Sequence, residues 1–190
     1  MLEGKRINLR LVEKEDVPLL AQWLNDVEFA GDYQHFPVQF SKAELEKRTV
    51  EQRLYQTEWV DFLVERKDGT KIGWAVHYVS APNFGWIEIG YAIVANERGK
   101  GYGTETVQIL VAYLFLTREI TRIQAVINTQ DAASRRVLEK TGFKREGTLR
   151  KALWDSRGEW ADGYIYSTLR EEWKEPRILT RTFWKKSGGK

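Results

Sequence analysis

The sequence has no cysteine, no long hydrophobic run and no large excess of one charge. Without cysteine, the chain has no disulfides, no thiolate zinc site and no cysteine nucleophile. No apolar stretch approaches the roughly 18–20 residues of a membrane-spanning helix. The charged first residues, MLEGKRINLRLVEKED, lack the hydrophobic segment of a secretory signal. We therefore expect a soluble cytoplasmic protein with no membrane partner.

Positive charges exceed negative charges only slightly. The chain carries 30 Lys and Arg against 27 Asp and Glu, a net charge of +3, and its pI is near 9.0. Basic and acidic residues are interspersed, so a nucleic-acid partner is not indicated. A small positive excess suits a smaller polyanion, such as a nucleotide cofactor. With 190 residues, 42% of them hydrophobic, the chain is long enough for one domain with a substantial core.

Hydrophobic periodicity and turn residues predict a mixed arrangement of helices and strands. Strands are expected over 5–12, 59–66, 71–80, 85–94, 123–128, 146–154 and 159–169. Helices are expected after Asp16 and over 41–56, 101–118 and 132–140, whereas the stretch 25–40 is irregular. We expect a single domain over 1–173 and a basic tail over 174–190 that is partly mobile or left from cloning.

The sharpest feature is the segment RGKGYGT over 98–104, between a predicted strand and a predicted helix. Its glycines carry no Cβ atom, so backbone N–H groups can converge on one point. The following helix adds the positive end of its dipole, and Arg98 and Lys100 add formal charge. The segment matches neither the dinucleotide-binding pattern G-x-G-x-x-G nor the Walker A pattern. Together these features predict a pyrophosphate site.

The pattern Arg98-x-x-Gly101-x-Gly103 resembles the R/Q-x-x-G-x-G/A motif of the GNAT acetyltransferases, where it holds the pyrophosphate of acetyl-coenzyme A. The segments IEIGYAIVANERGKGYGTE and NTQDAASRRVLEKTGFKREGTLR resemble the RimJ/RimL branch, which includes ribosomal-protein N-terminal acetyltransferases. The resemblance covers residues 5–173. It implies an α/β (α+β) GNAT fold with a mixed, mostly antiparallel sheet, a splayed parallel strand pair and flanking helices. The implied activity is transfer of an acetyl group from acetyl-CoA to an amine.

The resemblance also implies which residues hold acetyl-CoA, with no metal involved. The strand that ends at Val94 separates from the parallel strand 123–128, and the pantetheine arm lies in the gap. Because such a gap leaves backbone groups unpaired, it is a ligand site and not a core feature. The implied cofactor-binding residues are Ile93, Val94, Arg98, Gly99, Lys100, Gly101, Tyr102, Gly103, Thr104 and Asn128.

The catalytic acid is implied by a second element of the family. Its Asn-x-x-Ser element corresponds here to Asp131-x-x-Ser134, so aspartate replaces asparagine. Asp131 is also a good N-cap for the helix 132–140, and we expect it to act mainly as a cap. Ser134 falls where relatives place a hydroxyl near the thioester sulfur, which suits it to protonating the departing CoA thiolate. Its alternative role is that of an ordinary polar residue in the first helical turn.

The general base is less clearly defined. Glu88 lies on the strand before the glycine segment, where a glutamate often serves as base or holds water in this family. An equally reasonable role is that of a solvent-facing carboxylate. Some relatives place a glutamate near position 153, but this chain has Leu153. Glu88 is therefore our first choice as the base, followed by Asp162 and His35.

The amine acceptor is expected between the loop 25–40, Glu88 and the hairpin from Trp154 to Trp160. A protein N-terminus and a small-molecule amine, such as an antibiotic, polyamine or amino sugar, both remain open. A non-catalytic acyl-CoA sensor is the alternative function, and a monomer and a homodimer are both compatible with the sequence. The residues that we expect to contact the acceptor are Glu28, Asp32, Tyr33, Phe36 and Trp154.

Overall fold

The computed structural model describes residues 1–30, 41–55, 59–79, 86–155 and 158–180. In these residues, eight strands form one sheet with the order β1-β2-β3-β4-β5-β6-β8-β7. The strands are β1 (Leu2–Glu3), β2 (Ile7–Leu11), β3 (Trp59–Arg66), β4 (Lys71–Tyr78), β5 (Trp86–Ile93), β6 (Arg122–Asn128), β7 (Lys144–Trp154) and β8 (Trp160–Leu169). The helices are α1 (Val17–Leu24), α2 (Val27–Ala30), α3 (Lys42–Tyr55), α4 (Tyr102–Thr117) and α5 (Ala132–Lys140), with short 3-10 turns η1 (Lys14–Asp16) and η3 (Ala95–Glu97).

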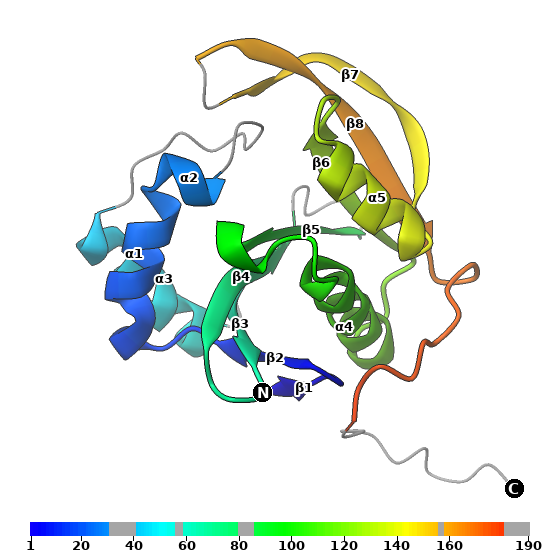
Figure 1. Ribbon diagram of the computed structural model, residues 1–190. Helices are drawn as coiled ribbons and strands as arrows, with labels where there is room; N and C mark the ends of the chain where they lie inside the picture. Colours follow the sequence, from blue (N-terminus) through cyan, green and yellow to red (C-terminus); the bar gives the residue numbers. More distant parts are fainter. Residues whose placement is uncertain (31–40, 56–58, 80–85, 156–157, 181–190) are drawn as a thin grey trace, which may run out of the picture.

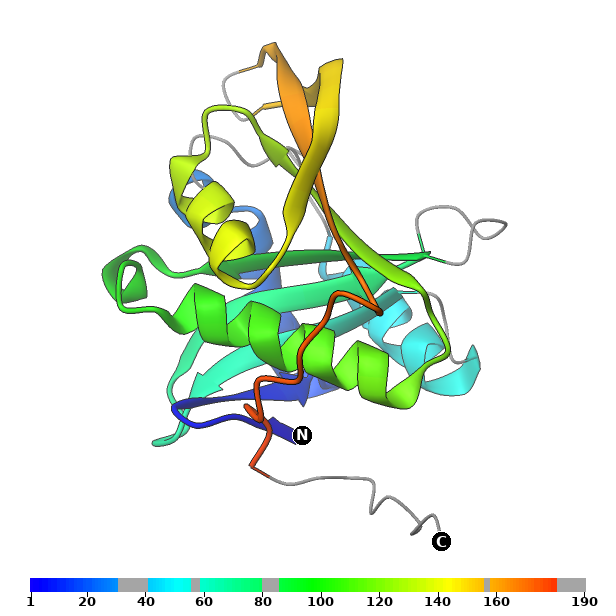
Figure 2. The same cartoon turned by 90° about the vertical axis from the view of Figure 1, so that its right-hand side faces the viewer.

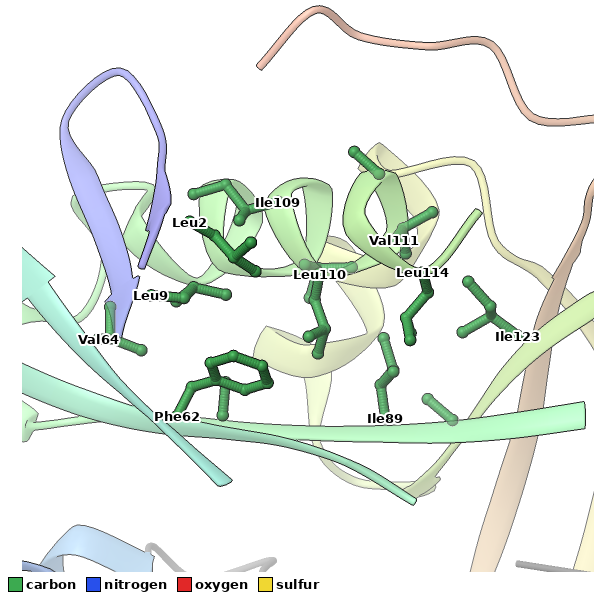
Figure 3. Close-up of a cluster of buried hydrophobic side chains, with 14 of the residues drawn as sticks. Leu2, Leu9, Phe62, Val64, Ile89, Ile109, Leu110, Val111, Leu114 and Ile123 are labelled. Atoms are coloured by element: carbon green, nitrogen blue, oxygen red, sulfur yellow. The ribbon is translucent and has the colours of Figure 1, made fainter. Parts of the chain in front are cut away.

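Helices cover both faces of the sheet, which is antiparallel except for the β5–β6 pair. In Figure 1, α1 and α3 lie on one side of the sheet and α4 lies on the other. The hydrophobic spacing of α4 predicts one apolar face, and the side chains of that face are buried. On it, Leu110 and Leu114 point toward Phe62 and Ile89 of the sheet (Figure 3). Each such leucine contributes about 1.5–3 kcal/mol of hydrophobic free energy. The mixed fold expected from the sequence is thus confirmed.

Local turn and capping signals are also confirmed. The capping box at the start of α3 is complete, because the Ser41 N–H donates to Glu44 Oε2 at 2.8 Å and the Glu44 N–H donates to Ser41 Oγ at 3.2 Å. Gly142 follows α5 with a φ of +89°, the left-handed conformation that ends many helices. These signals involve residues three or four positions apart, so they act before any distant part of the chain is in place.

Two short elements were not predicted. Strand β1 pairs with β2 through Leu2 and Leu9, but its two residues are too short to show a period. Helix α2 lies inside the stretch that we expected to be irregular. The rest of that stretch, residues 31–40, lies outside the described residues.

The segment after residue 173 is not a free tail in its described part. Ile178 is only 6% exposed and belongs to the same hydrophobic cluster as the buried residues of α4, with Leu179 packed against that cluster. The Thr180 N–H donates to the carbonyl of Glu3 at 2.8 Å, which fixes the segment beside the first strand. Residues 178–180 are therefore packed against the rest of the fold, with Ile178 buried and Leu179 partly buried. Residues 181–190 lie outside the described part of the chain.

The parallel strands β5 and β6 separate from each other, as the sequence resemblance implies. They pair only from Trp86 and Arg122 to Glu88 and Gln124. Beyond these residues, β5 continues alone with β4, while β6 continues with β8. Figure 2 shows β6 diverging from β5, with α5 placed on the side where the gap opens. Strand β5 therefore lacks a parallel partner from its middle to its end.

His77 is a buried base in the core beneath α4. It is 1% exposed, it packs against Phe62 and Tyr113, and neither ring nitrogen has a hydrogen-bond partner among the described residues. Burial, with a smaller effect of the positive charge of Arg118, lowers the pKa of His77 to about 3. The ring is therefore neutral at physiological pH.

We predict a loss of stability in mild acid that depends on His77. Below its ordinary pKa of 6.5, the unfolded chain binds a proton that the folded protein excludes until about pH 3. The free energy of unfolding is therefore unaffected by His77 above pH 6.5 and falls progressively as the pH drops below that value. From pH 7 to pH 5 the loss is about 2 kcal/mol. Urea unfolding at both pH values should show this loss in the wild type and its absence in His77→Leu; equal losses in both proteins would contradict the prediction.

Candidate active site

The gap between β5 and β6 opens into a cavity of about 800 Å³. Its walls come from β4, β5, β6, α5 and the glycine segment. Val94 and Lys100 do not line it. Residues predicted from the sequence that do line it are Glu88, Ile93, Arg98, Gly99, Gly101, Tyr102, Gly103, Thr104, Asn128 and Ser134.

The glycine segment forms a turn that only glycine accommodates well. Gly99 and Gly101 have φ values of +75° and +85°, which are unfavourable for residues with a Cβ atom. A Cβ at Gly101 would also approach Arg6 Nη2 to 3.0 Å. Helix α4 begins directly after this turn, and no side chain caps it. Because the first N–H groups of a helix have no partner within it, this end of the cavity can bind an anion.

The two cations of the glycine segment are engaged within the protein. Arg98 Nε donates to the carbonyl of Ile93 at 2.8 Å, and its Nη2 donates to the carbonyls of Glu28 and Phe29 at 3.1 and 2.9 Å. Lys100 Nζ lies 3.0 Å from Glu97 Oε2. Arg98 therefore joins α2 to the end of β5, in addition to placing positive charge beside the cavity.

Two further cations at this end were missed by the sequence analysis. Arg136 and Lys140, one helical turn apart on α5, both line the cavity. Their spacing of four residues was the available signal, because it places both side chains on one face of the helix. They add positive charge opposite the start of α4.

Asn128, at the cavity wall, has a buried polar group that lacks a hydrogen bond. The residue is 1% exposed, and its Oδ1 accepts the Gln130 N–H at 2.9 Å. Its Nδ2 has no hydrogen-bond partner among the described residues. An unsatisfied buried polar group costs about 1–3 kcal/mol, so a ligand carbonyl at this point would be favourable. By contrast, the Val94 N–H, where we expected a ligand contact, already donates to the carbonyl of Ile72 at 2.9 Å.

Ser134 is the third residue of α5, at the cavity wall. Asp131 caps the helix by accepting the Ser134 backbone N–H at 2.9 Å, which confirms the expected capping role. The Tyr91 hydroxyl lies 3.5 Å from the Ser134 carbonyl oxygen. Burial raises the pKa of Tyr91 far above its ordinary value, so that phenol stays protonated. The backbone of Ser134 is thus held from both sides.

Glu88 is 9% exposed, and both carboxylate oxygens are held in place. Oε1 accepts the Tyr78 hydroxyl at 2.6 Å, and Oε2 accepts the Gln124 amide at 2.9 Å. The Gln124 amide is itself oriented by Arg122, whose Nη2 donates to Gln124 Oε1 at 3.2 Å. Since an ionised carboxylate has about four acceptor positions, Glu88 retains capacity for a proton or a cation in the cavity. Burial and the charge of Glu88 raise the pKa of Tyr78 well above its ordinary range, so Tyr78 remains a donor.

Of the two alternative bases, the one within the described residues does not line this cavity. Asp162 Oδ1 accepts the Lys151 N–H at 2.8 Å in the β7–β8 hairpin, and Asp162 does not line the cavity. His35 lies outside the described residues, as do Asp32, Tyr33 and Phe36.

The remaining predicted acceptor residues lie apart from the cavity wall. Trp154 packs edge-on against Trp160 at 5.3 Å and lines a separate surface depression of about 570 Å³. Glu28 does not line the main cavity, although its carbonyl accepts a hydrogen bond from Arg98. The main cavity instead contains aromatic residues that were not selected from the sequence: Phe29, Trp59, Trp74, Tyr78 and Tyr91.

Within the described ranges, no group of His, Cys, Asp or Glu side chains is placed to hold a metal ion. In the same part of the chain, no helix has both the length and the hydrophobicity needed to cross a membrane.

Comparison with known proteins places the chain in a family. Residues 6–144 match the family described as the acetyltransferase (GNAT) domain. The aminoglycoside N(6')-acetyltransferase type 1 of Klebsiella pneumoniae is 32% identical over 157 residues, which cover 75% of this chain and 76% of that protein.

Solved structures of the same fold are also similar. The spermidine N-acetyltransferase of Vibrio cholerae, solved with CoA and spermine, has a TM-score of 0.78 at 20% identity and covers 88% of this chain and 97% of that one. The ribosomal-protein-S5-alanine acetyltransferase of Vibrio fischeri has a TM-score of 0.77 at 22% identity and covers 90% and 97%. With a family match over most of its length and a glycine segment at the mouth of the β5–β6 gap, the chain belongs to the GNAT acetyltransferases, which use acetyl-CoA as co-substrate.

Proposed function

We propose that this protein transfers the acetyl group of acetyl-CoA to a primary amine by direct attack of the amine. The observation that supports this most is the cavity itself. Its lining combines an uncapped helix start and basic residues with Glu88 and Ser134. An anionic cofactor and an amine can therefore meet in one cavity.

The residues that hold the cofactor follow from these groups. The N–H groups at the start of α4, with Arg136 and Lys140, bind the pyrophosphate. The pantetheine arm occupies the gap between β5 and β6, where the free Nδ2 of Asn128 donates to an amide carbonyl of the arm. Acetyl-CoA supplies the activated acetyl group.

Glu88 acts as the base, directly or through a water. An alkyl amine with a pKa of ~10.4 must lose a proton at a cost of roughly 4–5 kcal/mol at pH 7, whereas an α-amine with a pKa of ~7.7–8.0 needs only about 1 kcal/mol. The neutral nitrogen attacks the thioester carbonyl; a C–N bond forms, the C–S bond breaks, and the amine proton passes to Glu88. Ser134 donates a proton to the departing thiolate.

Ser134→Ala should slow acetyl transfer by about 10²–10⁴-fold while acetyl-CoA affinity stays nearly unchanged. The reason is that the hydroxyl acts on a charge that forms only during the reaction. The Asp131 cap is retained, because it binds the backbone N–H of residue 134. Single-turnover rates and calorimetry with acetyl-CoA measure the two effects separately. If Ser134→Ala turns over at the wild-type rate when the chemical step limits the rate, Ser134 has no catalytic role and is only a polar residue at the start of the helix.

An acceptor screen tests the function as a whole. Alkyl amines, polyamines, aminoglycosides and peptides with free N-termini are incubated with acetyl-CoA, and free thiol and product mass are followed. Thiol release with an acetylated amine product supports the proposal. Binding of acetyl-CoA without thiol release for any amine would indicate the alternative, a non-catalytic acyl-CoA sensor.

A further inference from the structure

One wall of the cavity is built from three aromatic side chains, Trp59, Trp74 and Tyr78, which we call the aromatic wall. Trp74 and Tyr78 lie on the same face of β4, four residues apart. Trp59 comes from β3 and stacks on Tyr78, with ring centroids 4.5 Å apart and planes inclined by 16°. These rings come from two neighbouring strands on the side of the sheet opposite α4.

Strand β5 leaves space in front of this wall. Its residues beside Trp74, Val76 and Tyr78 are Ala92, Gly90 and Glu88. At Gly90 a Cβ would lie only 3.0 Å from Val76 Cγ1. Small residues at two of these positions keep the aromatic wall open to the cavity, and the third position carries the Glu88 carboxylate.

The buried carboxylate of Asp61 holds the indole rings of Trp59 and Trp74 in place. Asp61 on β3 is 2% exposed. Its Oδ1 accepts the indole N–H of Trp74 at 2.8 Å and that of Trp59 at 3.2 Å. Because both indole N–H groups are bonded to Asp61, the two rings offer hydrocarbon and π surface, and not their donors, to the cavity.

Charge divides the cavity into two ends. The lining cations Arg98, Arg136 and Lys140 belong to the glycine segment and α5, and the lining carboxylates Glu97 and Asp131 come directly before these two elements. On strands β3, β4 and β5, the only charged side chain among the described lining residues is Glu88, which accepts a hydrogen bond from Tyr78. An anion is therefore favoured at one end, and a cation beside aromatic faces at the other.

We propose that the aromatic wall and Glu88 form the acceptor subsite, and that it receives a small aliphatic amine as its ammonium ion. This inference rests on the proposed function. The alkyl carbons lie against the rings, and the nitrogen lies at Glu88. A peptide N-terminus fits less well, because its first peptide group would be buried against Trp59 and Trp74, whose only donors are already bonded to Asp61. Asp61 is a positioning residue that acts through the two indoles.

The first test separates the amine from the cofactor. Trp74→Leu and Trp59→Leu should each raise the KM for n-butylamine by about 5–30-fold, as expected for loss of part of the apolar contact between the alkyl carbons and the ring. The KM for acetyl-CoA should stay within about twofold, and Trp173→Leu, a tryptophan outside the cavity, should change neither constant. Unchanged amine KM in both wall variants would overturn the proposal. If the KM for n-butylamine rises in Trp154→Leu instead, the acceptor binds at the β7–β8 hairpin.

The second test concerns Asp61. Asp61→Leu removes the acceptor for both indoles and should raise the amine KM as the Trp variants do. Asp61→Asn retains a carbonyl that accepts N–H groups, so it should restore most of the amine affinity. If both substitutions have the same effect on the amine KM, Asp61 does not act by orienting the indoles. Should Asp61→Leu fail to fold, the comparison of Asp61→Asn with the wild type still decides, because a large rise in that variant would contradict the proposed role.

A binding experiment distinguishes this proposal from the proposed function. Calorimetry with CoA present measures n-butylamine, n-butanol and alanine amide on the wild type and on Trp74→Leu. Binding of the amine but not the alcohol, lost in Trp74→Leu, supports the subsite even if no thiol is ever released. If amines are acetylated normally and the amine KM does not change in the variants of the aromatic wall, the proposed function stands and the proposed subsite is wrong. Tighter binding of alanine amide than of n-butylamine would overturn the assignment of the acceptor class.

Discussion

Replacing Gly103 with aspartate is expected to lower acetyl-CoA affinity at least about a hundredfold without unfolding the protein. Gly103 lies in the first turn of α4 at the cavity wall, and a Cβ there meets Tyr91 and Val137 at ordinary contact distances of 3.6 and 3.7 Å. The fold therefore accepts the side chain, and a carboxylate at a helix start is favourable for the helix. The same charge repels a pyrophosphate by about 4 kcal/mol at 4 Å in a partly screened environment.

Gly103→Asp is thus expected to affect stability and acetyl-CoA affinity in opposite directions. Melting temperature should stay equal or rise, while calorimetry shows weaker acetyl-CoA binding. Gly103→Asn is the matched control, because it has the same shape without the charge and should lose far less affinity. If the aspartate and asparagine variants bind acetyl-CoA equally well, the pyrophosphate does not lie at this helix start.

Glu88→Gln should reduce kcat for an alkyl amine by about 10²–10⁴-fold, the usual effect of removing a general base. The amide cannot take the proton, and its NH2 group would face the donors of Tyr78 or Gln124. Activity that remains should increase with pH, as more of the amine becomes neutral in solution. Steady-state rates from pH 7 to pH 10 measure both effects.

The acceptor's own pKa supplies the control for Glu88. A dipeptide α-amine needs only about 1 kcal/mol to lose its proton at pH 7, so its loss of rate in Glu88→Gln should be much smaller than that of an alkyl amine. Tyr78→Phe keeps the carboxylate and the ring, and we expect only a modest reduction in kcat. If Glu88→Gln lowers the rate equally for both amines, or if its rate does not change with pH, Glu88 is not the general base.

Helices, strands and caps were predictable because they depend on neighbours in the chain. The Ser41–Glu44 capping box and the Asp131 cap each join residues three positions apart. The glycine segment was equally visible, since a glycine-rich turn before an amphipathic helix is a local pattern. These signals were sufficient to predict the mixed fold and the turn that precedes α4.

Other features required distant segments to meet. Trp59, Trp74 and Gln124 have no shared pattern in the sequence, and only the registers of β3 with β4, of β4 with β5 and of β5 with β6 place them on the same part of the sheet as Glu88. The same holds for Ile178, which joins the hydrophobic cluster of α4 although it comes from the charged C-terminal part of the chain. Aromatic residues are common in cores, so composition alone does not separate a wall of a site from packing.

The sequence by itself thus determined the order of the longer helices and strands, the helix caps and the glycine-rich turn, because short-range hydrogen bonds and hydrophobic periodicity encode them. Tertiary structure alone decided which carboxylate is held in the cavity and which aromatic rings stand beside it. The physical reason is that strand register and side-chain packing depend on contacts between residues far apart in the chain. In this protein, Asp61, Tyr78 and Gln124 become parts of one site only when four strands align.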